Sequence, residues 1–180
     1  MIRKRVEPAA ELEVELLTDT IHSEIGSIVI VTDARTVVAL DFADGETRMM
    51  ELLSRRFENV VLRHEHDPLD AAGRIEAYLA GDLQALDEIK VNPGGTEFQQ
   101  TVWLALRKIP AGTTRTYAQL AAAIGRPSAP RAVGFANSLN PVALVIPCHR
   151  LVGSDATLTG YAGGLERKRW LLRHEGALLD

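Results

Sequence analysis

A helix-start signal occurs twice in the second half of the chain and limits the fold more than any other feature. Residues 96–99 (Thr-Glu-Phe-Gln) and 116–119 (Thr-Tyr-Ala-Gln) both match the capping box. In this motif a threonine hydroxyl and a glutamine three residues later satisfy free backbone N–H groups reciprocally. The first box predicts a helix to about Lys108, stopped by a proline. The second predicts a short helix over 117–124, stopped by Gly125.

A third short helix follows closely. Ser128 is expected to cap a helix over 129–138, which an Asn-Pro pair ends. Two short helices joined by a Gly-Arg-Pro turn indicate a helix-turn-helix. Residues 153–160 predict a hairpin wing beside it, and residues 164–175 predict a last helix ended by Gly176.

The first half of the chain mixes strand and helix signals. β-branched runs at 27–32 and 36–41 predict a hairpin, and apolar spacing predicts helices over 46–57 and about 68–80. The first ~20 residues have no clean period, which leaves a loose extension and an edge strand open. Asn-Pro-Gly-Gly (92–95) is the best linker candidate. We expect a mixed α/β (α+β) fold with an α/β domain over 1–92 and a mostly helical domain over 93–180.

The two halves also differ in charge. Residues 1–91 hold 10 Lys+Arg and 19 Asp+Glu, a net charge of −9, whereas residues 92–180 hold 10 Lys+Arg and 5 Asp+Glu, a net charge of +5. The whole-chain charge of −4 argues weakly against nucleic acid, but it hides this split. A polyanion-binding domain beside an acidic partner domain would show such an asymmetry. Arginines that only keep a surface soluble are the alternative.

Cys148 is the only cysteine, which excludes an internal disulfide and a multi-cysteine zinc site. It stands in Pro-Cys-His-Arg (147–150), directly behind the apolar run 142–146. Because the thiolate is the nucleophile and nearby positive charge lowers a cysteine pKa, His149 and Arg150 favour chemistry. Packing is the alternative, since free cysteines are commonly buried and inert. An unpaired thiol fits a reducing cytosol, and no apolar run approaches the length of a membrane span.

The predicted helix over 129–138 has little side-chain bulk around one long residue near its start, Arg131. A helix that reads the major groove normally carries several long polar side chains. A bare helix suits close approach to a shallow or narrow groove with one inserted arginine, although tight helix packing would also explain small residues. The small residues are Ala132, Gly134, Ala136 and Ser138.

Five motifs occur in a characteristic order. They are Arg-Ala-Val-Gly (131–134), Asn-Pro (140–141), Pro-Cys-His-Arg (147–150), Gly-Tyr-Ala-Gly-Gly (160–164) and Leu-Leu-Arg-His-Glu-Gly (171–176). In this order and spacing they closely resemble the O6-alkylguanine-DNA alkyltransferases (methylated-DNA–protein-cysteine methyltransferases). The resemblance is dense over 96–176 and looser in the first half, where Ile-Gly-Ser (25–27) is similar to the family's opening hairpin. It implies a ribonuclease-H-like sheet in the first domain and a winged helix-turn-helix in the second.

The resemblance implies irreversible transfer of an alkyl group from O6 of guanine in duplex DNA to a protein cysteine. Transfer from O4 of thymine to the same cysteine is left open. The base must leave the stack to reach a pocket. Arg131 would fill the gap in the stack, and Tyr117 would assist rotation and supply a proton to the departing guanine. Small residues at Ala132, Gly134 and Ser138 would let the helix approach the minor groove.

The resemblance also implies the roles of the site residues. Cys148 would be the acceptor, with His149 and Glu175 generating its thiolate through a bridging water, because adjacent side chains on an extended segment point apart. Asn140 would brace the turn around the cysteine. The expected substrate-binding set, in which Arg150 would also help to hold the segment, is Tyr161, Ala162, Leu151 and Arg150.

Three departures from the family pattern stand out. Ala162 replaces a serine of some members, which removes a hydroxyl contact and leaves the backbone N–H. Phe135 stands where some members carry glycine, so it either points inward or changes the fit to the groove. The zinc-binding cysteines of some relatives are absent. Residues 64–67 (His-Glu-His-Asp) imitate a metal cluster but are better read as a solvated polar turn.

We therefore predict a single-use DNA repair protein that is cytoplasmic and monomeric, with cooperative assembly on DNA left open. Its partner is double-stranded DNA containing O6-alkylguanine, and we expect no cofactor, no metal and no membrane association. The alternatives are a lesion-binding relative without the acceptor cysteine and a helix-turn-helix regulator. The first conflicts with Cys148, and the second conflicts with the bare helix. A cysteine hydrolase fits less well, because its Cys and His normally come from distant segments.

Overall fold

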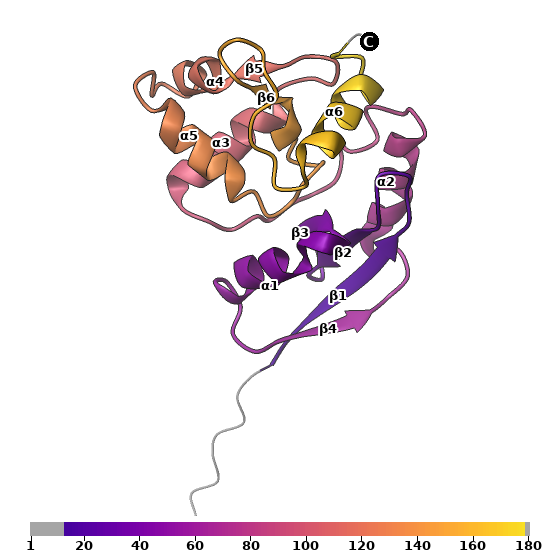
Figure 1. Ribbon diagram of the computed structural model, residues 1–180. Helices are drawn as coiled ribbons and strands as arrows, with labels where there is room; N and C mark the ends of the chain where they lie inside the picture. The colour runs from indigo at the N-terminus through magenta and orange to yellow at the C-terminus, as the bar shows by residue number, and fades with distance from the viewer. Residues whose placement is uncertain (1–12, 179–180) are drawn as a thin grey trace, which may run out of the picture.

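The computed structural model describes residues 13–178, and its first half is built on a four-stranded sheet (Figure 1). The strand order is β3-β2-β1-β4. Neighbouring strands pair antiparallel except for the parallel pair β1–β4. The hairpin predicted within 27–41 is confirmed as β2–β3. The strands are β1 (Val14–Ile21), β2 (Ile28–Thr32), β3 (Val37–Phe42) and β4 (Val60–His64).

β1 lies inside the sheet, so the expectation of a loose extension or an edge strand is wrong for residues 14–21. Residues 1–12 lie outside the described part of the chain. The buried Asp19 hides the apolar period of β1, and its carboxylate accepts backbone N–H bonds from Thr20 and Asp67 at 2.8 Å each. β4, which the sequence did not predict, occupies the edge of the sheet with a largely exposed residue pattern.

The two faces of the sheet contribute side chains to two separate buried hydrophobic clusters. One face packs its Leu16, Val31 and Val38 against α1 (Glu46–Ser54), which a 3-10 turn over Ala43–Gly45 precedes. The other face contributes to a larger cluster that also takes in α2 and the second half of the chain. Because strand side chains alternate between faces, the sheet forms the layer between these two clusters. The second helix, α2 (Ala71–Leu79), follows a 3-10 turn over Pro68–Asp70.

The second half of the chain is mostly helical, and both predicted capping boxes are confirmed. The Thr96 and Thr116 hydroxyls accept the backbone N–H groups of Gln99 and Gln119 at 3.3 and 3.1 Å. The glutamine side chains accept the threonine N–H groups at 2.9 and 2.8 Å. The helices are α3 (Glu97–Arg107), α4 (Tyr117–Ala123), α5 (Pro130–Ser138) and α6 (Leu165–His174).

Two local expectations in this half are wrong. α5 begins at Pro130 after Ala129, without the side-chain cap expected from Ser128. Proline is well placed there because the N–H it lacks would be unpaired in any case. The segment 153–160 contains no strand and is not a hairpin wing. It is a turn closed by a bond from the Gly153 N–H to the Thr157 carbonyl at 2.8 Å.

The short strands β5 (Arg115–Thr116) and β6 (Leu151–Val152) instead pair with each other in parallel. β6 directly follows the 3-10 turn Cys148–Arg150. The strand that precedes α4 is therefore fixed beside the turn that carries the cysteine.

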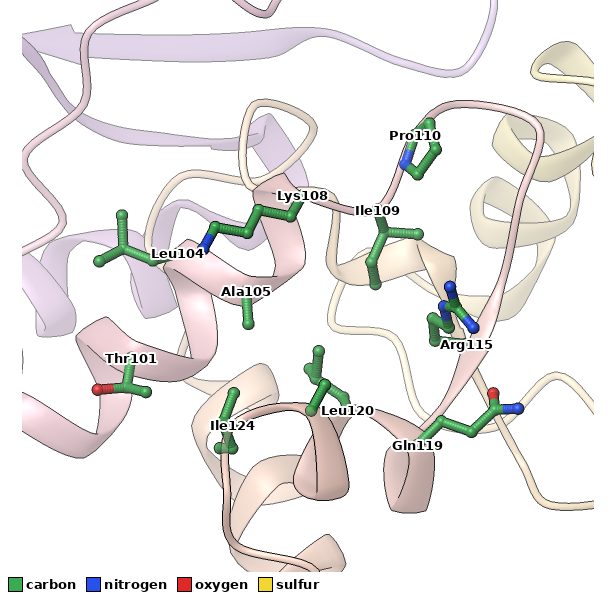
Figure 2. A pocket seen from close by; sticks show the side chains of 11 residues that line it. Thr101, Leu104, Ala105, Lys108, Ile109, Pro110, Arg115, Gln119, Leu120 and Ile124 are labelled. Carbon is green, nitrogen blue, oxygen red and sulfur yellow. The ribbon is translucent and has the colours of Figure 1, made fainter.

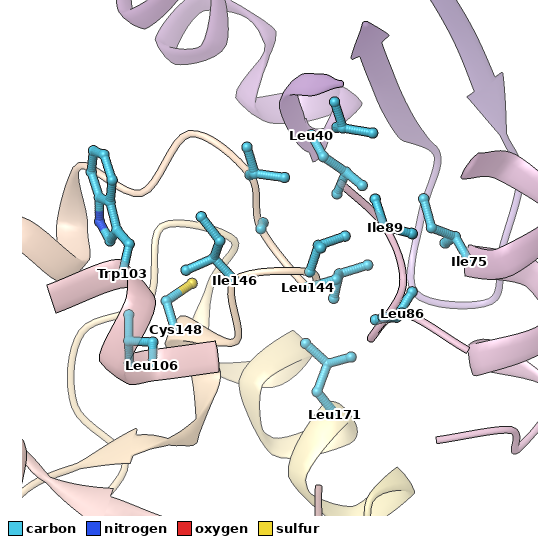
Figure 3. Close-up of a cluster of buried hydrophobic side chains, with 14 of the residues drawn as sticks. Leu40, Ile75, Leu86, Ile89, Trp103, Leu106, Leu144, Ile146, Cys148 and Leu171 are labelled. Carbon is cyan, nitrogen blue, oxygen red and sulfur yellow. The ribbon is translucent and has the colours of Figure 1, made fainter. Parts of the chain in front are cut away.

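The two halves meet along β3. The Leu40 N–H donates to the Pro141 carbonyl at 2.9 Å, and the Leu40 carbonyl accepts the Ala143 N–H at 2.8 Å. Figure 3 shows the buried side chains that continue across this junction, from Leu40 and Ile75 to Leu144. The sheet thereby supports the segment that leads into Cys148. None of the described helices combines the length and apolar character that a membrane crossing requires.

Candidate active site

Cys148 lies in the wall of a pocket of about 290 Å³. Cys148 is the first residue of the 3-10 turn Cys148–Arg150 and is only 7% exposed. It lies beside Ile146 and Leu106 in the buried cluster (Figure 3). The thiol is thus shielded from bulk solvent but open to the pocket. The other lining residues come from both halves of the chain: Asp41, Arg48, Tyr117, Gly134, Asn137, Ser138, Asn140, Ala143, Gly160, Tyr161, Ala162 and Gly163.

Asn140 holds the chain in place around the cysteine. Its Nδ2 donates to the Ile146 carbonyl at 2.8 Å, and its Oδ1 accepts the Val142 N–H at 3.0 Å. Asn140 also favours the thiolate of Cys148, because it opposes the rise that burial causes in the pKa of that thiol. The placement fits the bracing role that the resemblance implied for this residue.

The Glu175 carboxylate accepts hydrogen bonds from three buried side chains. Its Oε1 accepts from the Tyr78 hydroxyl at 2.7 Å, from His149 Nε2 at 2.9 Å and from Arg150 Nη2 at 2.8 Å. Its Oε2 accepts from Arg150 Nε at 2.9 Å. Burial by itself would raise the pKa of Glu175, but the bonds and charges of His149 and Arg150 outweigh it and hold that pKa far below the usual range. The carboxylate is therefore ionised at neutral pH.

The contact with Glu175 fixes which nitrogen of His149 carries the proton. An ionised carboxylate can only accept, so Nε2 donates and Nδ1 keeps a lone pair. Nδ1 is buried, and no described residue offers it a hydrogen-bond partner. Burial lowers the pKa of His149 against the opposing effect of Glu175, so the resting imidazole is neutral. The arrangement provides a buried base whose protonated form Glu175 would stabilise.

Burial raises the pKa of Cys148, contrary to the expectation that the adjacent His149 and Arg150 would lower it. His149 is neutral at rest, and the charge of Arg150 is neutralised by Glu175. The cations that favour the thiolate come instead from distant segments, Arg48 on α1 and Lys168 on α6. The resting thiol is thus protonated, and forming its nucleophilic thiolate requires a proton acceptor.

Lys168 is fully buried and binds the backbone beside the pocket. Its ammonium donates to the carbonyls of Leu151 and Thr159 at 2.5 and 2.7 Å. Burial lowers the pKa of Lys168 to about 8, partly offset by Cys148. At neutral pH the amine is still mostly charged, and it ties the loop over 159–163 to β6.

Two tyrosines of the pocket keep protonated phenols. The Tyr117 hydroxyl donates weakly to the Thr159 carbonyl at 3.5 Å, and burial raises the pKa of Tyr117. The Tyr161 hydroxyl is buried without a hydrogen-bond partner in the described part of the chain, and burial raises the pKa of Tyr161 strongly. Both phenols are available as proton or hydrogen-bond donors to a molecule in the pocket.

The expected substrate-binding residues divide into two groups. Tyr161 and Ala162 line the pocket, whereas Arg150 and Leu151 do not. Arg150 faces Glu175 and donates through Nη1 to the Ile109 carbonyl, and the Leu151 carbonyl is bonded to Lys168. Arg150 and Leu151 thus support the segment that carries Cys148, and their contact with the substrate stays a prediction.

α5 presents its small residues as expected, with one exception. Ala132 and Ser138 are exposed, and Gly134 lines the pocket beside the Tyr117 ring. Arg131 is exposed at the start of the helix. Ala136 is buried, and its carbonyl accepts the Trp103 indole N–H at 2.9 Å, so this residue serves helix packing.

Sequence reasoning missed the residues that reach the pocket from the first half. Arg48 pairs with Asp41 at 2.5 Å and donates to the carbonyls of Ser138 and Asn140 at 2.8 and 2.9 Å. Burial raises the pKa of Asp41, with Arg48 opposing the shift. Tyr78 reaches Glu175 from α2. No local signal marks the bonds from Arg48 to Ser138 and Asn140 or from Tyr78 to Glu175, because each joins residues 90 or more positions apart.

A larger pocket of about 630 Å³ lies between α3 and α4, and Figure 2 shows its mixed lining, including Leu104, Lys108 and Arg115. It shares no lining residue with the Cys148 pocket, so volume alone does not identify the reactive site. His64 and His66 are largely exposed beside Asp19. Within residues 13–178, no group of three or more His, Cys, Asp or Glu side chains is placed to hold a metal ion.

Comparison with known proteins connects this geometry to a family. The family model "6-O-methylguanine DNA methyltransferase, DNA binding domain" matches residues 97–177. The methylated-DNA–protein-cysteine methyltransferase of Salmonella typhimurium is 44% identical over 172 residues, covering 91% of this chain and 98% of that protein.

Solved structures agree along the same length. The Mycobacterium tuberculosis O6-methylguanine methyltransferase gives a TM-score of 0.75 at 35% identity, covering 90% of this chain and 93% of that one. The Mycobacterium tuberculosis OGT in complex with DNA gives a TM-score of 0.71 at 37% identity, covering 91% and 94%. Because identity at this level extends over nearly the whole of both chains, this protein belongs to the methylated-DNA–protein-cysteine methyltransferase family.

Proposed function

We propose that this protein repairs DNA by taking the alkyl group from O6 of guanine onto Cys148, once per molecule. The observation that carries the proposal is a single thiol in the wall of a pocket. Asn140 braces the turn that leads to this thiol, and the hydrogen-bonded pair of His149 and Glu175 follows from the next residue. Relatives that match nearly the full length are named for this transfer to cysteine. The donor is double-stranded DNA that contains the alkylated base.

The transfer is a one-step displacement at the alkyl carbon. The Cys148 sulfur forms the new S–C bond as the C–O6 bond breaks, and the guanine leaves with the bonding electrons. His149 Nδ1 takes the thiol proton through a bridging water, and Glu175 stabilises the resulting imidazolium. Tyr117, protonated because burial raises its pKa, supplies a proton to the departing guanine. Tyr161 and Ala162 complete the pocket around the base.

The base reaches the pocket by rotating out of the duplex. α5 borders the pocket through Gly134 and Ser138, and its small exposed residues, including Ala132, permit close approach to the minor groove. Arg131 then occupies the space that the guanine leaves in the stack, which offsets part of the unstacking energy. The basic second half supplies the phosphate contacts.

The function is tested by the mass of the intact protein after incubation with a duplex that contains O6-methylguanine. A thioether offers no leaving-group path back to a thiol at neutral pH, so uptake should plateau at one methyl per molecule, located on Cys148 by peptide mapping. Many turnovers per molecule, or methyl on any other residue, would refute single-use transfer to Cys148.

Replacement of Arg131 by alanine should separate base rotation from chemistry. We expect repair of duplex substrate to slow by at least tenfold, while reaction with a free O6-alkylated guanine base changes little, because a free base needs no rotation. Rates on both substrates, measured in single turnover, give the comparison. Equal losses on the two substrates would mean that Arg131 supports the fold.

Three finer expectations belong to this proposal. The chain divides near residues 92 and 93 into an acidic and a basic domain, as the charge split and the glycine-rich linker suggest. The protein acts as a monomer in the reducing cytosol, where a free thiol persists. A lesion-binding role without transfer is the alternative, and the pocket-facing Cys148 argues against it.

A further inference from the structure

Phe135 is an exposed aromatic side chain on the helix that borders the reactive pocket. It is 67% exposed, the highest value among the exposed large hydrophobic residues of the described chain. The alternative that it points inward is therefore wrong. A single exposed apolar side chain is common on protein surfaces, so the place of Phe135 on α5 matters more than its exposure.

The helical period places Phe135 on the same surface as Arg131. Residues four apart lie on one face of a helix, and Arg131 and Phe135 are both exposed there. The opposite face is fixed by the buried Val133 and Ala136. Gly134 and Asn137 turn toward the pocket, so Phe135 stands on the flank of Arg131 that lies away from it.

The surroundings of Phe135 are small and rigidly held. Its exposed neighbours Ala132 and Ser138 are short, so the ring projects beyond the surface that would approach DNA. The helix backbone is anchored by Trp103 at the Ala136 carbonyl and by Arg48 at the Ser138 carbonyl. Because the backbone is anchored and the neighbouring side chains are short, close approach of α5 to a groove brings the ring against it.

We propose that Phe135 is an apolar wedge that enters the minor groove beside Arg131 and loosens the base step next to the extruded guanine. The inference rests on the proposed function, and it adds a residue to which that function assigns no role. Apolar side chains that insert between base steps and partly unstack them are a recurrent device of minor-groove proteins. Arg131 fills the space that the guanine leaves in the base stack. Phe135 acts on the flank of Arg131 that lies away from the pocket, where it lowers the energy barrier to rotating the guanine out.

The test compares Phe135→Ala with the parent protein on two substrates. We expect repair of an O6-methylguanine duplex to slow by about tenfold, equivalent to about 1.4 kcal/mol. Reaction with free O6-benzylguanine base should stay within about twofold, because the pocket is unchanged. Leu104→Ala is the matched control: Leu104 is 63% exposed on α3, outside the α5 surface, and its loss should change neither rate.

Two further measurements distinguish a wedge from a general contact. With 2-aminopurine next to the lesion, binding of the parent protein should raise the fluorescence, and Phe135→Ala should lose most of that rise. Phe135→Leu should retain part of it, and Phe135→Lys should retain none. Unchanged fluorescence and duplex rate in Phe135→Ala, or faster duplex repair by Phe135→Lys, would overturn the wedge. If the parent protein itself takes no methyl from the duplex, the proposed function fails instead.

Discussion

Replacing Cys148 with alanine should abolish alkyl transfer while DNA binding persists. The chain has no second cysteine, and the charges of Arg48 and Lys168 favour the thiolate of this one. The substitution removes a nearly buried sulfur and leaves the exposed face of α5 intact, so the duplex should still bind. Transfer is measured by intact mass, and binding by fluorescence anisotropy on the same duplex.

The parent protein provides the matching measurement. The thiol titrated in denaturant should fall from one per chain to none as repair proceeds. Cys148→Ser keeps the shape of the side chain but replaces the thiol with a far less acidic hydroxyl, and it too should be inactive. Methyl uptake by either variant would show that another residue can accept the group, and the assignment of Cys148 would fail.

Replacing Glu175 with glutamine should slow transfer without eliminating it. Glutamine can still accept from His149 Nε2, but it carries no charge to stabilise the imidazolium that forms when Nδ1 takes the thiol proton. One pKa unit corresponds to ~1.4 kcal/mol, so at neutral pH the rate should fall roughly tenfold to a few hundredfold. As pH rises through the Cys148 pKa, solvent removes the thiol proton directly, and the two rates should converge.

The pH–rate profile with a free alkylated base is the decisive measurement, because its rate does not depend on DNA binding. Glu175→Gln also leaves the buried Arg150 without its carboxylate, which costs stability, so rates should be taken well below the melting temperature of the variant. Glu166→Gln is a suitable control, since Glu166 is an exposed glutamate on α6, the helix that ends just before Glu175, and is paired with Arg169. Overlaying profiles for Glu175→Gln and the parent protein would exclude Glu175 from thiol activation.

Local chemistry made the helices of the second half predictable. The capping boxes at Thr96 and Thr116 act within four residues, so the sequence alone locates both helix starts. Ser128 does not cap α5 because the helix starts at Pro130, which leaves Ala129 in the N-cap position. The predicted wing failed because short side-chain bonds, such as Thr157 to Asp155 at 2.6 Å, favour a turn over a strand pair.

The electrostatics of the site could not be read from neighbours in the sequence. Arg150 lies two positions from Cys148, yet its charge is neutralised by the ion pair with Glu175. Arg48 lies 100 positions from Cys148 and acts on the thiol through the folded chain. The motifs located the reacting residues, whereas burial and long-range pairing decided their protonation.

The contacts of Tyr78 and Arg48 constrain how the sequence of this protein can evolve. Neither residue belongs to the segment that carries the acceptor, yet one donates to Glu175 and the other holds the carbonyls of Ser138 and Asn140. Selection for repair therefore acts on α1 and α2 as well as on the motif around Cys148. Exchange of the first half between lineages should succeed only when these two side chains, or substitutes with the same reach, are inherited with it.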